Sequence, residues 1–351
     1  METSDQRPAL EPTEPDDSPN PAGSVGPIAP EWAAFLITWL LSTAAILGGV
    51  RALVRNYSYS KTELSAILIA FALQFALYWI PGFPGIRRRF EAHFSIVMRA
   101  FVAGCLLMFP YLVYGAGTGL KPVAFLKLIV VAGFALGIYA VIPPRSQNFS
   151  WQDFAAMLVI AVPVYTGWYR DTWSVPVYLD AMARLFAVAL AAFAFLSVRR
   201  LDGVGYVWRM QAGDWAEAAK QLLFFLIIGI PLGFWLRFIA WHPRIEGIAA
   251  IAFSFVGIFL FIAMAEELFF RGMLQNLLEK SLKNEYLARG IASAIFGLSH
   301  IHHGFPNWRY VLMAGIAGWF YGTAWHNRRS LMAPSVVHAA VDTLWRHFFL
   351  V

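Results

Sequence analysis

The feature that most constrains this chain is a series of long, nearly uninterrupted apolar segments. They lie at residues 32–54, 64–80, 94–114, 122–142, 154–170, 177–198, 221–241, 255–279, 288–304, 309–326 and 331–350. Most approach the ~20 residues that a helix needs to cross a bilayer. Strands of a membrane barrel would instead alternate polar and apolar residues over ~10 positions. The sequence therefore predicts an all-α, polytopic membrane protein, a helical bundle of about 10–11 transmembrane helices.

The composition excludes an ordinary water-soluble enzyme. Hydrophobic residues make up 59% of the 351-residue chain and charged residues only 14%, against about 25% charged in typical soluble domains. The net charge is +6, but Lys and Arg lie mostly in short connections such as 87–89 and 328–329. These are topology signals rather than a nucleic-acid surface, so we predict no nucleic-acid partner. The positive-inside rule favours an N-terminus in the cytoplasm. We expect the membrane to be the cytoplasmic membrane of a bacterium.

Three regions differ in composition. Residues 1–30 hold seven prolines and six acidic residues, which predicts a disordered, acidic, Pro-rich tail. Residues 31–200 carry about six apolar segments and form an N-terminal transmembrane module in which no chemistry is evident. The more polar stretch 199–220 marks the boundary with a second transmembrane domain, 201–351. The single cysteine, Cys105, excludes an internal disulfide framework.

Acidic residues inside apolar segments are costly and indicate functional sites. Of 21 Asp and Glu residues, only Glu266, Glu267 and Asp342 fall well inside such segments. Arg271 follows Glu267 by four residues on the same helix face, so these two can neutralise each other. Glu266 is turned ~100° away from Glu267 on a helix and keeps no partner there. It is the better candidate for chemistry.

Two histidines on later segments complete the candidate set. His300 lies in SAIFGLSHIHHG, and His338 precedes Asp342 by four residues on one helix face. Counted at ~1.5 Å per residue from the nearest cytoplasmic charge, the depths are about 21 Å for Glu266, about 16 Å for His300, about 13 Å for His338 and about 19 Å for Asp342. Three helices are therefore expected to bring carboxylates and imidazoles to one level of the bilayer.

Such a set can hydrolyse an amide without a covalent nucleophile. A carboxylate and a neutral imidazole can take a proton from water, and a second His with a polar neighbour can stabilise the oxyanion. This preferred interpretation requires no cofactor. Glu266, His300 and His338 also form a ligand set that hydrolytic zinc uses, so a zinc ion is the alternative. No HExxH motif is present to decide between them.

Three motifs in order resemble those of a known family. EELFFR fits EExxxR, Phe296 to His300 fits FxxxH, and His338 to Asp342 fits HxxxN except at its last position. They resemble the CPBP family of Abi-like intramembrane proteases, which includes type II CAAX prenyl endopeptidases and bacteriocin-processing proteins. The resemblance covers about residues 215–351 and leaves 31–200 outside.

The resemblance implies a role for each residue. Glu266 with His300 would activate water, His338 with residue 342 would stabilise the oxyanion, and Glu267, Arg271 and Phe296 would support the geometry. Residue 342 is Asp where Asn is usual. An ionised Asp cannot donate to an oxyanion, so it is protonated, orients His338 or binds a cation.

We therefore expect an endopeptidase that cleaves a membrane-embedded or lipid-tethered protein within the bilayer, at a site reached from the cytoplasmic side. The alternative from another class is a proton-coupled transporter or channel in which the Glu, His and Asp side chains form a relay. A third possibility is an inert scaffold of the same fold. A purely structural alternative is that Glu266, Glu267 and Arg271 form a buried ion-pair network that only fixes helix packing.

Overall fold

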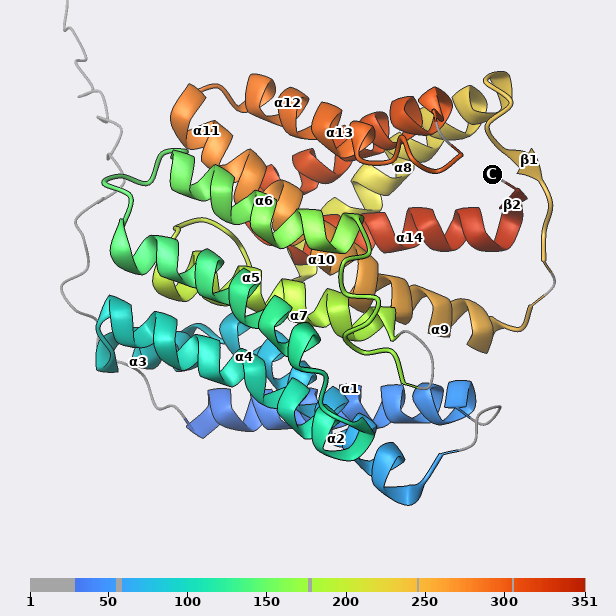
Figure 1. Ribbon diagram of the computed structural model, residues 1–351. Coiled ribbons are helices and arrows are strands. Elements are labelled where there is room, and N and C mark those ends of the chain that lie inside the picture. The colour runs from blue at the N-terminus through green and yellow to red at the C-terminus, as the bar shows by residue number, and fades with distance from the viewer. Residues whose placement is uncertain (1–28, 55–58, 176–178, 245, 305, 351) are drawn as a thin grey trace, which may run out of the picture.

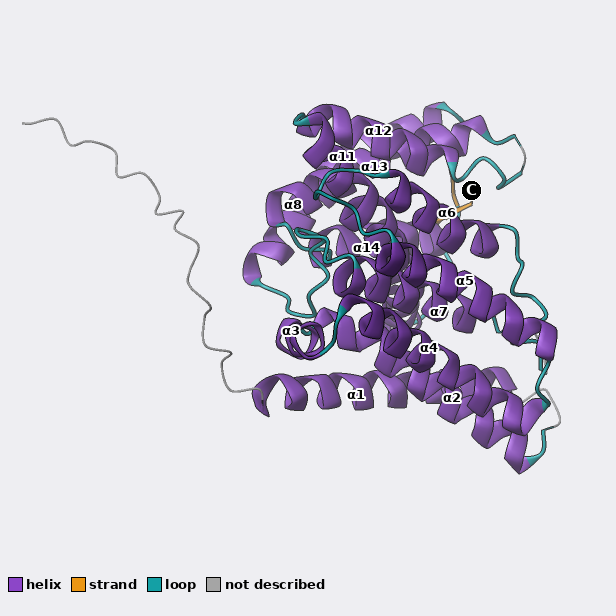
Figure 2. Cartoon of the chain, turned by 60° about the vertical axis from the view of Figure 1, so that its left-hand side comes forward, coloured by secondary structure: helices purple, strands orange, loops and turns teal. Residues whose placement is uncertain are grey.

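The computed structural model describes residues 29–54, 59–175, 179–244, 246–304 and 306–350. It is helical almost throughout, which confirms the all-α class. The helices run roughly along one direction, with α1 and α2 at one side of the bundle and α11 to α13 at the opposite side (Figures 1 and 2). Helices α7 and α14 lie between these two sides.

The elements of the first half are α1 (Ala29–Val54), α2 (Lys61–Trp79), η1 (Ile80–Gly82), α3 (Pro84–His93), α4 (Ile96–Thr118), α5 (Pro122–Val141), α6 (Trp151–Tyr165), α7 (Asp180–Ala192) and η2 (Phe193–Val198). Those of the second half are α8 (Ala212–Trp235), β1 (Ala240–Trp241), α9 (Ile248–Ile258), η3 (Phe259–Ala263), α10 (Met264–Glu267), η4 (Leu268–Gln275), α11 (Asn276–Leu282), α12 (Glu285–Leu298), α13 (Trp308–Arg328), α14 (Met332–Phe348) and β2 (Phe349–Leu350). Strands β1 and β2 pair antiparallel.

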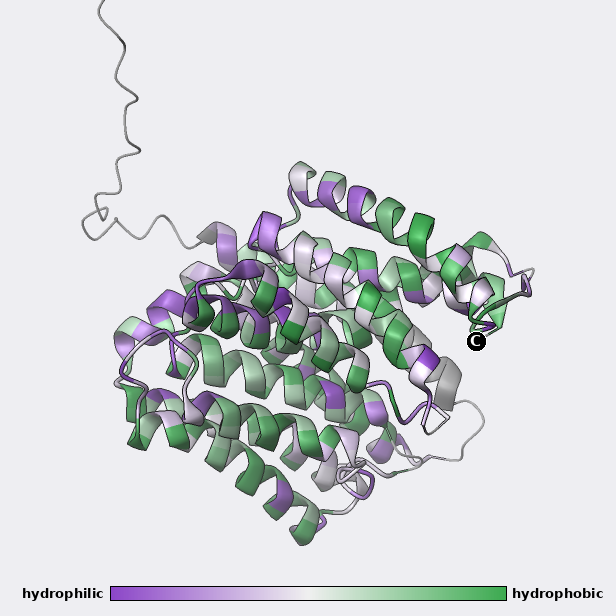
Figure 3. Ribbon diagram, turned by 90° about the horizontal axis from the view of Figure 1, so that it is seen from above, coloured by the Kyte–Doolittle hydropathy of each residue, from purple (hydrophilic) through white to green (hydrophobic). Residues whose placement is uncertain are grey.

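Within the described residues, six helical segments are long and apolar enough to cross a membrane: 61–82, 96–118, 122–141, 180–198, 212–235 and 248–282. Large apolar side chains such as Leu40, Val123 and Ile227 are exposed on the outside of the bundle. Hydrophobic residues cover the middle of many helices, and hydrophilic residues gather toward the ends (Figure 3). Because such a surface is stable only against lipid, the chain is an integral membrane protein.

Each of the eleven predicted segments contains a helix, but several boundaries differ. Helix α8 begins at Ala212 rather than at 221, because Gln211 and Asp214 cap its first turn reciprocally. Helix α12 ends at Leu298, short of the predicted 304. Helix α3 and the β1–β2 pair were not predicted. Residues 1–28 of the expected tail lie outside the described residues, and 29–30 already belong to α1.

The predicted division near residue 200 does not coincide with a gap in the packing. One continuous cluster of buried apolar residues includes members from both sides of it. Tyr78 on α2 donates a hydrogen bond to the carbonyl oxygen of Leu260 on η3 over 3.1 Å. Tyr206 donates to the carbonyl oxygen of Tyr78 over 2.6 Å. The two regions share a core, and their status as separate domains stays a prediction.

Helices α12 and α13 pack closely because glycines face each other between them. A Cβ added at Gly297 would lie 2.5 Å from the carbonyl oxygen of Val311 and 3.0 Å from the backbone nitrogen of Gly315. No side chain fits there, so the glycines permit the approach that places α12 beside the site.

Candidate active site

The two adjacent glutamates lie in the middle of the longest helical segment, 248–282. Helix α10 carries Glu266 and Glu267 and is flanked on both sides by π-helical turns, η3 and η4. Such wider turns are uncommon and occur frequently at functional sites, because they change which side chains face the core.

Glu267 is fully buried and holds three helices together. Its carboxylate pairs with Arg271, with Oε2 3.1 Å from Nε, and accepts a hydrogen bond from Nδ1 of His338 over 2.8 Å. The Arg271 guanidinium also donates to the carbonyl oxygen of Gly318 on α13 over 3.1 Å. A buried charge satisfied in this way is a structural element of the site.

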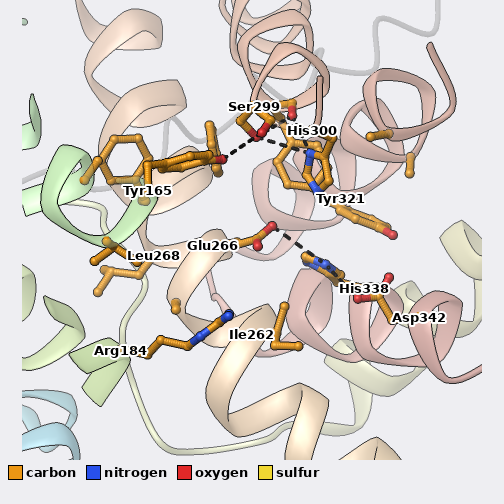
Figure 4. A pocket seen from close by; sticks show the side chains of 18 of the residues that line it. Tyr165, Arg184, Ile262, Glu266, Leu268, Ser299, His300, Tyr321, His338 and Asp342 are labelled. Carbon is orange, nitrogen blue, oxygen red and sulfur yellow. Dashed lines mark hydrogen bonds and ion pairs between the residues drawn. The ribbon is translucent and has the colours of Figure 1, made fainter. Parts of the chain in front are cut away.

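Glu266 points to the opposite side, into a cavity (Figure 4). Its side chain is 29% exposed, and its Oε2 has no hydrogen-bond partner among the described residues. The same oxygen lies 3.9 Å from Nε2 of His338. Because the side chain is partly exposed and lines the cavity, the carboxylate can accept a proton from a molecule there.

His338 connects the buried pair to the cavity. Because its Nδ1 donates to Glu267, its Nε2 faces Glu266 and Asp342, with Oδ2 of Asp342 3.5 Å away. The ring stacks on Tyr321, with the centroids 4.8 Å apart and the planes at 16°. Phe296 meets it edge-on at 5.8 Å. The imidazole is thus held in one orientation from all sides.

His300 reaches the same cavity from a turn. It lies just past the end of α12, where Nδ1 is 2.9 Å from the carbonyl oxygen of Phe296 and 3.2 Å from Oγ of Ser299. Its ring stacks on Tyr310, with the centroids 5.1 Å apart. Since Nδ1 is occupied locally, Nε2 is the nitrogen left to serve the cavity.

Phe296 lies at the centre of the supporting contacts. Its ring is 4.8 Å from that of His300 and 4.4 Å from the guanidinium carbon of Arg271. The predicted supporting residue thus contacts both histidines and the buried cation. This arrangement explains why an aromatic side chain four residues before His300 is useful.

The cavity has a volume of about 410 Å³, and its lining includes Glu266, His300, His338 and Asp342. The structure thus brings together the four side chains that the sequence places on three segments. Their catalytic roles stay predictions.

Helices α6 and α7 complete the wall, although the sequence indicated no chemistry there. Tyr165 and Arg184 line the cavity, and the Tyr165 hydroxyl donates to the carbonyl oxygen of Ser299 over 3.1 Å. Tyr165 lies within the apolar segment 154–170, and no feature of the sequence distinguishes it from its neighbours.

In the turn that follows α12, partial burial, together with the neighbouring His302 and His300, lowers the pKa of His303.

The exposed part of the cavity lining lies at one end of the bundle. It includes Tyr165 and His302, next to the turn that follows α12. Figure 1 places this end on the side of β1 and β2, away from α3 and the α11–α12 turn. If the arginine-rich end faces the cytoplasm, the exposed lining faces the opposite side, so the predicted orientation and cytoplasmic access do not agree.

The predicted metal ligands do not form a metal centre in this arrangement. Among the described residues, no group of three or more His, Cys, Asp or Glu side chains is placed so that it could hold a metal ion. The set of Glu266, His300 and His338 therefore does not fit a zinc ion in this conformation. No step below is routed through a metal.

A comparison with protein families identifies this part of the chain. Residues 248–344 match the family model described as type II CAAX prenyl endopeptidase Rce1-like. No curated protein and no solved structure matches the chain. The matched range lies within the predicted 215–351, runs from α9 into α14 and contains all four candidate residues. Residues 248–344 of this integral membrane protein are thus similar to the Rce1-like type II CAAX prenyl endopeptidases.

Proposed function

We propose that the chain is an intramembrane endopeptidase in which Glu266 activates water to hydrolyse a peptide bond of a membrane-associated protein. One observation carries the proposal. A partly exposed carboxylate shares one cavity with two oriented imidazoles, inside a membrane-spanning bundle. The family match supports a protease.

In the first step, Glu266, assisted by His300, takes a proton from water. The water oxygen bonds to the carbonyl carbon, and the electron pair of the C=O bond moves to oxygen. His338 acts as an imidazolium: its Nδ1–H donates to Glu267, its Nε2–H stabilises this oxyanion, and Asp342 orients the ring. When the carbon–nitrogen bond breaks, the proton held by Glu266 passes to the amine nitrogen.

The substrate is a protein embedded in the bilayer or tethered to it by a lipid, and the family name makes prenylated proteins one class. Apolar residues of α6, α7 and α10 line the cavity beside the carboxylate. Such a wall suits an apolar peptide segment and excludes bulk water, which strengthens the electrostatic contacts.

The orientation follows from the charges in the connections. We propose an N-terminus in the cytoplasm of a bacterial membrane, because Arg87 to Arg89 and Arg328 to Arg329 lie at the end of the bundle that faces away from β1 and β2. The cavity would then be approached from the non-cytoplasmic side.

The test is a proteomic comparison of membrane fractions from cells with the wild-type chain and with Glu266→Gln. We expect a full-length precursor to accumulate only with the variant. The matched control is Glu63→Gln, a half-buried residue in the capping box of α2, where glutamine can still cap. Folded Glu266→Gln protein that processes the same substrate at the wild-type rate would exclude the mechanism. Because the proposed mechanism uses no metal ion, we expect purified protein to keep its proteolytic activity in the presence of a strong chelator.

A further inference from the structure

A second cavity lies at the arginine-rich end of the bundle, beside the short helix α3. This helix has ten residues, PGIRRRFEAH, too few to cross a bilayer. Its Ile86 is buried, and Arg88 and Arg89 are exposed. Since α3 joins the end of α2–η1 to the start of α4, it lies where membrane-crossing helices leave the hydrocarbon. That level is occupied by lipid headgroups.

The cavity, called here the α3 pocket, has a volume of about 320 Å³. Its basic lining comes from α3: Arg87, Arg89 and His93. Its apolar lining continues to Leu106, ten residues along α4 from Ile96, or about 15 Å. The pocket therefore passes from a basic rim to an apolar depth, as a lipid does from headgroup to chain.

Arginines that do not line the pocket also lie close to its rim. Arg99 is only 7% exposed and donates from Nη1 to the carbonyl oxygen of Ser197 over 2.7 Å. Ser197 itself lines the α3 pocket. The Nε of Arg99 has no hydrogen-bond partner among the described residues. A buried guanidinium with an unused donor favours an anion close by.

The carboxylates around the rim do not balance these cations. Glu91 is shared, with Oε1 3.4 Å from Nε of Arg87 and Oε2 3.6 Å from Nε of Arg200. Burial raises the pKa of Glu91, and the surrounding arginines oppose this change. Glu31 accepts the backbone N–H of Ile86 at the start of α3. Arg89 forms no ion pair within the part of the chain that the structure describes.

We propose that the α3 pocket binds an anionic phospholipid of the leaflet at this end of the bundle. The phosphate lies between Arg87 and Arg89, and an acyl chain lies along Leu106 and Phe193. Charge complementarity selects the headgroup, because basic pockets at the interface attract anionic lipids. The apolar inner part of the pocket favours a lipid over a soluble anion, because a soluble anion would leave that part unoccupied.

The experiment measures binding of a chain-labelled fluorescent phosphatidylglycerol to the purified full-length protein in detergent. Unlabelled phosphatidylglycerol should compete, whereas phosphatidylcholine with the same chains should compete much less. Arg87→Gln with Arg89→Gln should weaken binding about 25-fold, at about fivefold per arginine. The matched control removes two exposed arginines from the same end, Arg145→Gln with Arg209→Gln, and should change affinity less than twofold.

Two further variants keep the proposal testable if the double variant unfolds. Arg89→Gln alone should weaken binding about fivefold. Leu106→Trp fills the apolar depth without changing charge and should also weaken binding. Equal competition by phosphatidylcholine, equal loss in the control pair, or equally strong competition by glycerol 3-phosphate would each overturn the proposal. These measurements need no proteolysis, so they stand apart from the proposed function.

Discussion

Nδ1 of His338 donates to the carboxylate of Glu267 over 2.8 Å, across two helices. This one contact separates the roles of two adjacent glutamates. Glu267 is fully buried and pairs with His338 and Arg271 within the core, while Glu266 is 29% exposed and lines the cavity. The same contact turns Nε2 of His338 toward Glu266.

Glu267→Gln should destabilise the protein. It leaves the fully buried guanidinium of Arg271 without its anion, and breaking a buried pair costs about 3–5 kcal/mol. Thermal unfolding in detergent should show a large fall in Tm. Glu266→Gln is the control and should leave Tm nearly unchanged. Equal destabilisation by the two variants would contradict this division of roles.

Asp342→Asn should retain most of the proteolytic activity. The amide keeps the size of the side chain and an oxygen near Nε2 of His338, which Oδ2 approaches to 3.5 Å, and it adds a donor for an oxyanion. Asp342→Ala removes the group and should lower kcat. The measurement is cleavage rate with the substrate identified by proteomics. If the Asn variant is as inactive as the Ala variant, the negative charge itself is required.

Tyr165→Phe should lower kcat roughly fivefold and leave KM unchanged. The hydroxyl donates to the backbone of Ser299, beside His300, and a hydrogen bond of this kind contributes about 1 kcal/mol. Tyr286→Phe, an exposed tyrosine at the other end of α12, is the matched control. A change confined to KM would show that Tyr165 contacts substrate instead of positioning the turn.

Asp153→Asn should destabilise the region before residue 200. The Asp153 carboxylate is fully buried, 2.6 Å from Nε of Arg199, and accepts a hydrogen bond from Tyr139 over 3.0 Å. We expect a loss of about 3–5 kcal/mol, measured by thermal unfolding.

Asp171→Asn is the control for that variant, because Asp171 pairs with Lys127 but is 51% exposed. It should cost about 0–1 kcal/mol. The hydrogen bond from Lys127 lowers the pKa of Asp171. The small stability from this pair is therefore present near neutral pH and is lost as pH falls through the lowered pKa. Equal losses of stability in Asp153→Asn and Asp171→Asn would contradict the expectation that burial sets the contribution of an ion pair.

The orientation can be tested by labelling single cysteines in intact cells. Cys105 is replaced by Ala, and Cys is introduced at the exposed positions His302 and Arg145. A membrane-impermeant maleimide should label His302→Cys from outside the cell and label Arg145→Cys only after lysis. The reverse pattern would mean that the cavity opens to the cytoplasm and that the N-terminus lies on the opposite side of the membrane.

Sequence alone was sufficient for the fold class and for the location of the helices. Long apolar runs can satisfy their backbone in a bilayer only as helices, and each predicted segment contains one. Boundaries were less certain, because caps such as that of Gln211 and Asp214 depend on local geometry rather than on hydropathy.

The rarity of ionisable residues within apolar runs singled out Glu266, Glu267 and Asp342, because such groups are costly in hydrocarbon. Tertiary structure decided how these groups are shared. It joined Glu267 to His338, placed His300 on a turn, and brought Tyr165 from α6 to the turn that holds His300. These contacts join segments far apart in sequence, and helix packing, which no local pattern encodes, sets them.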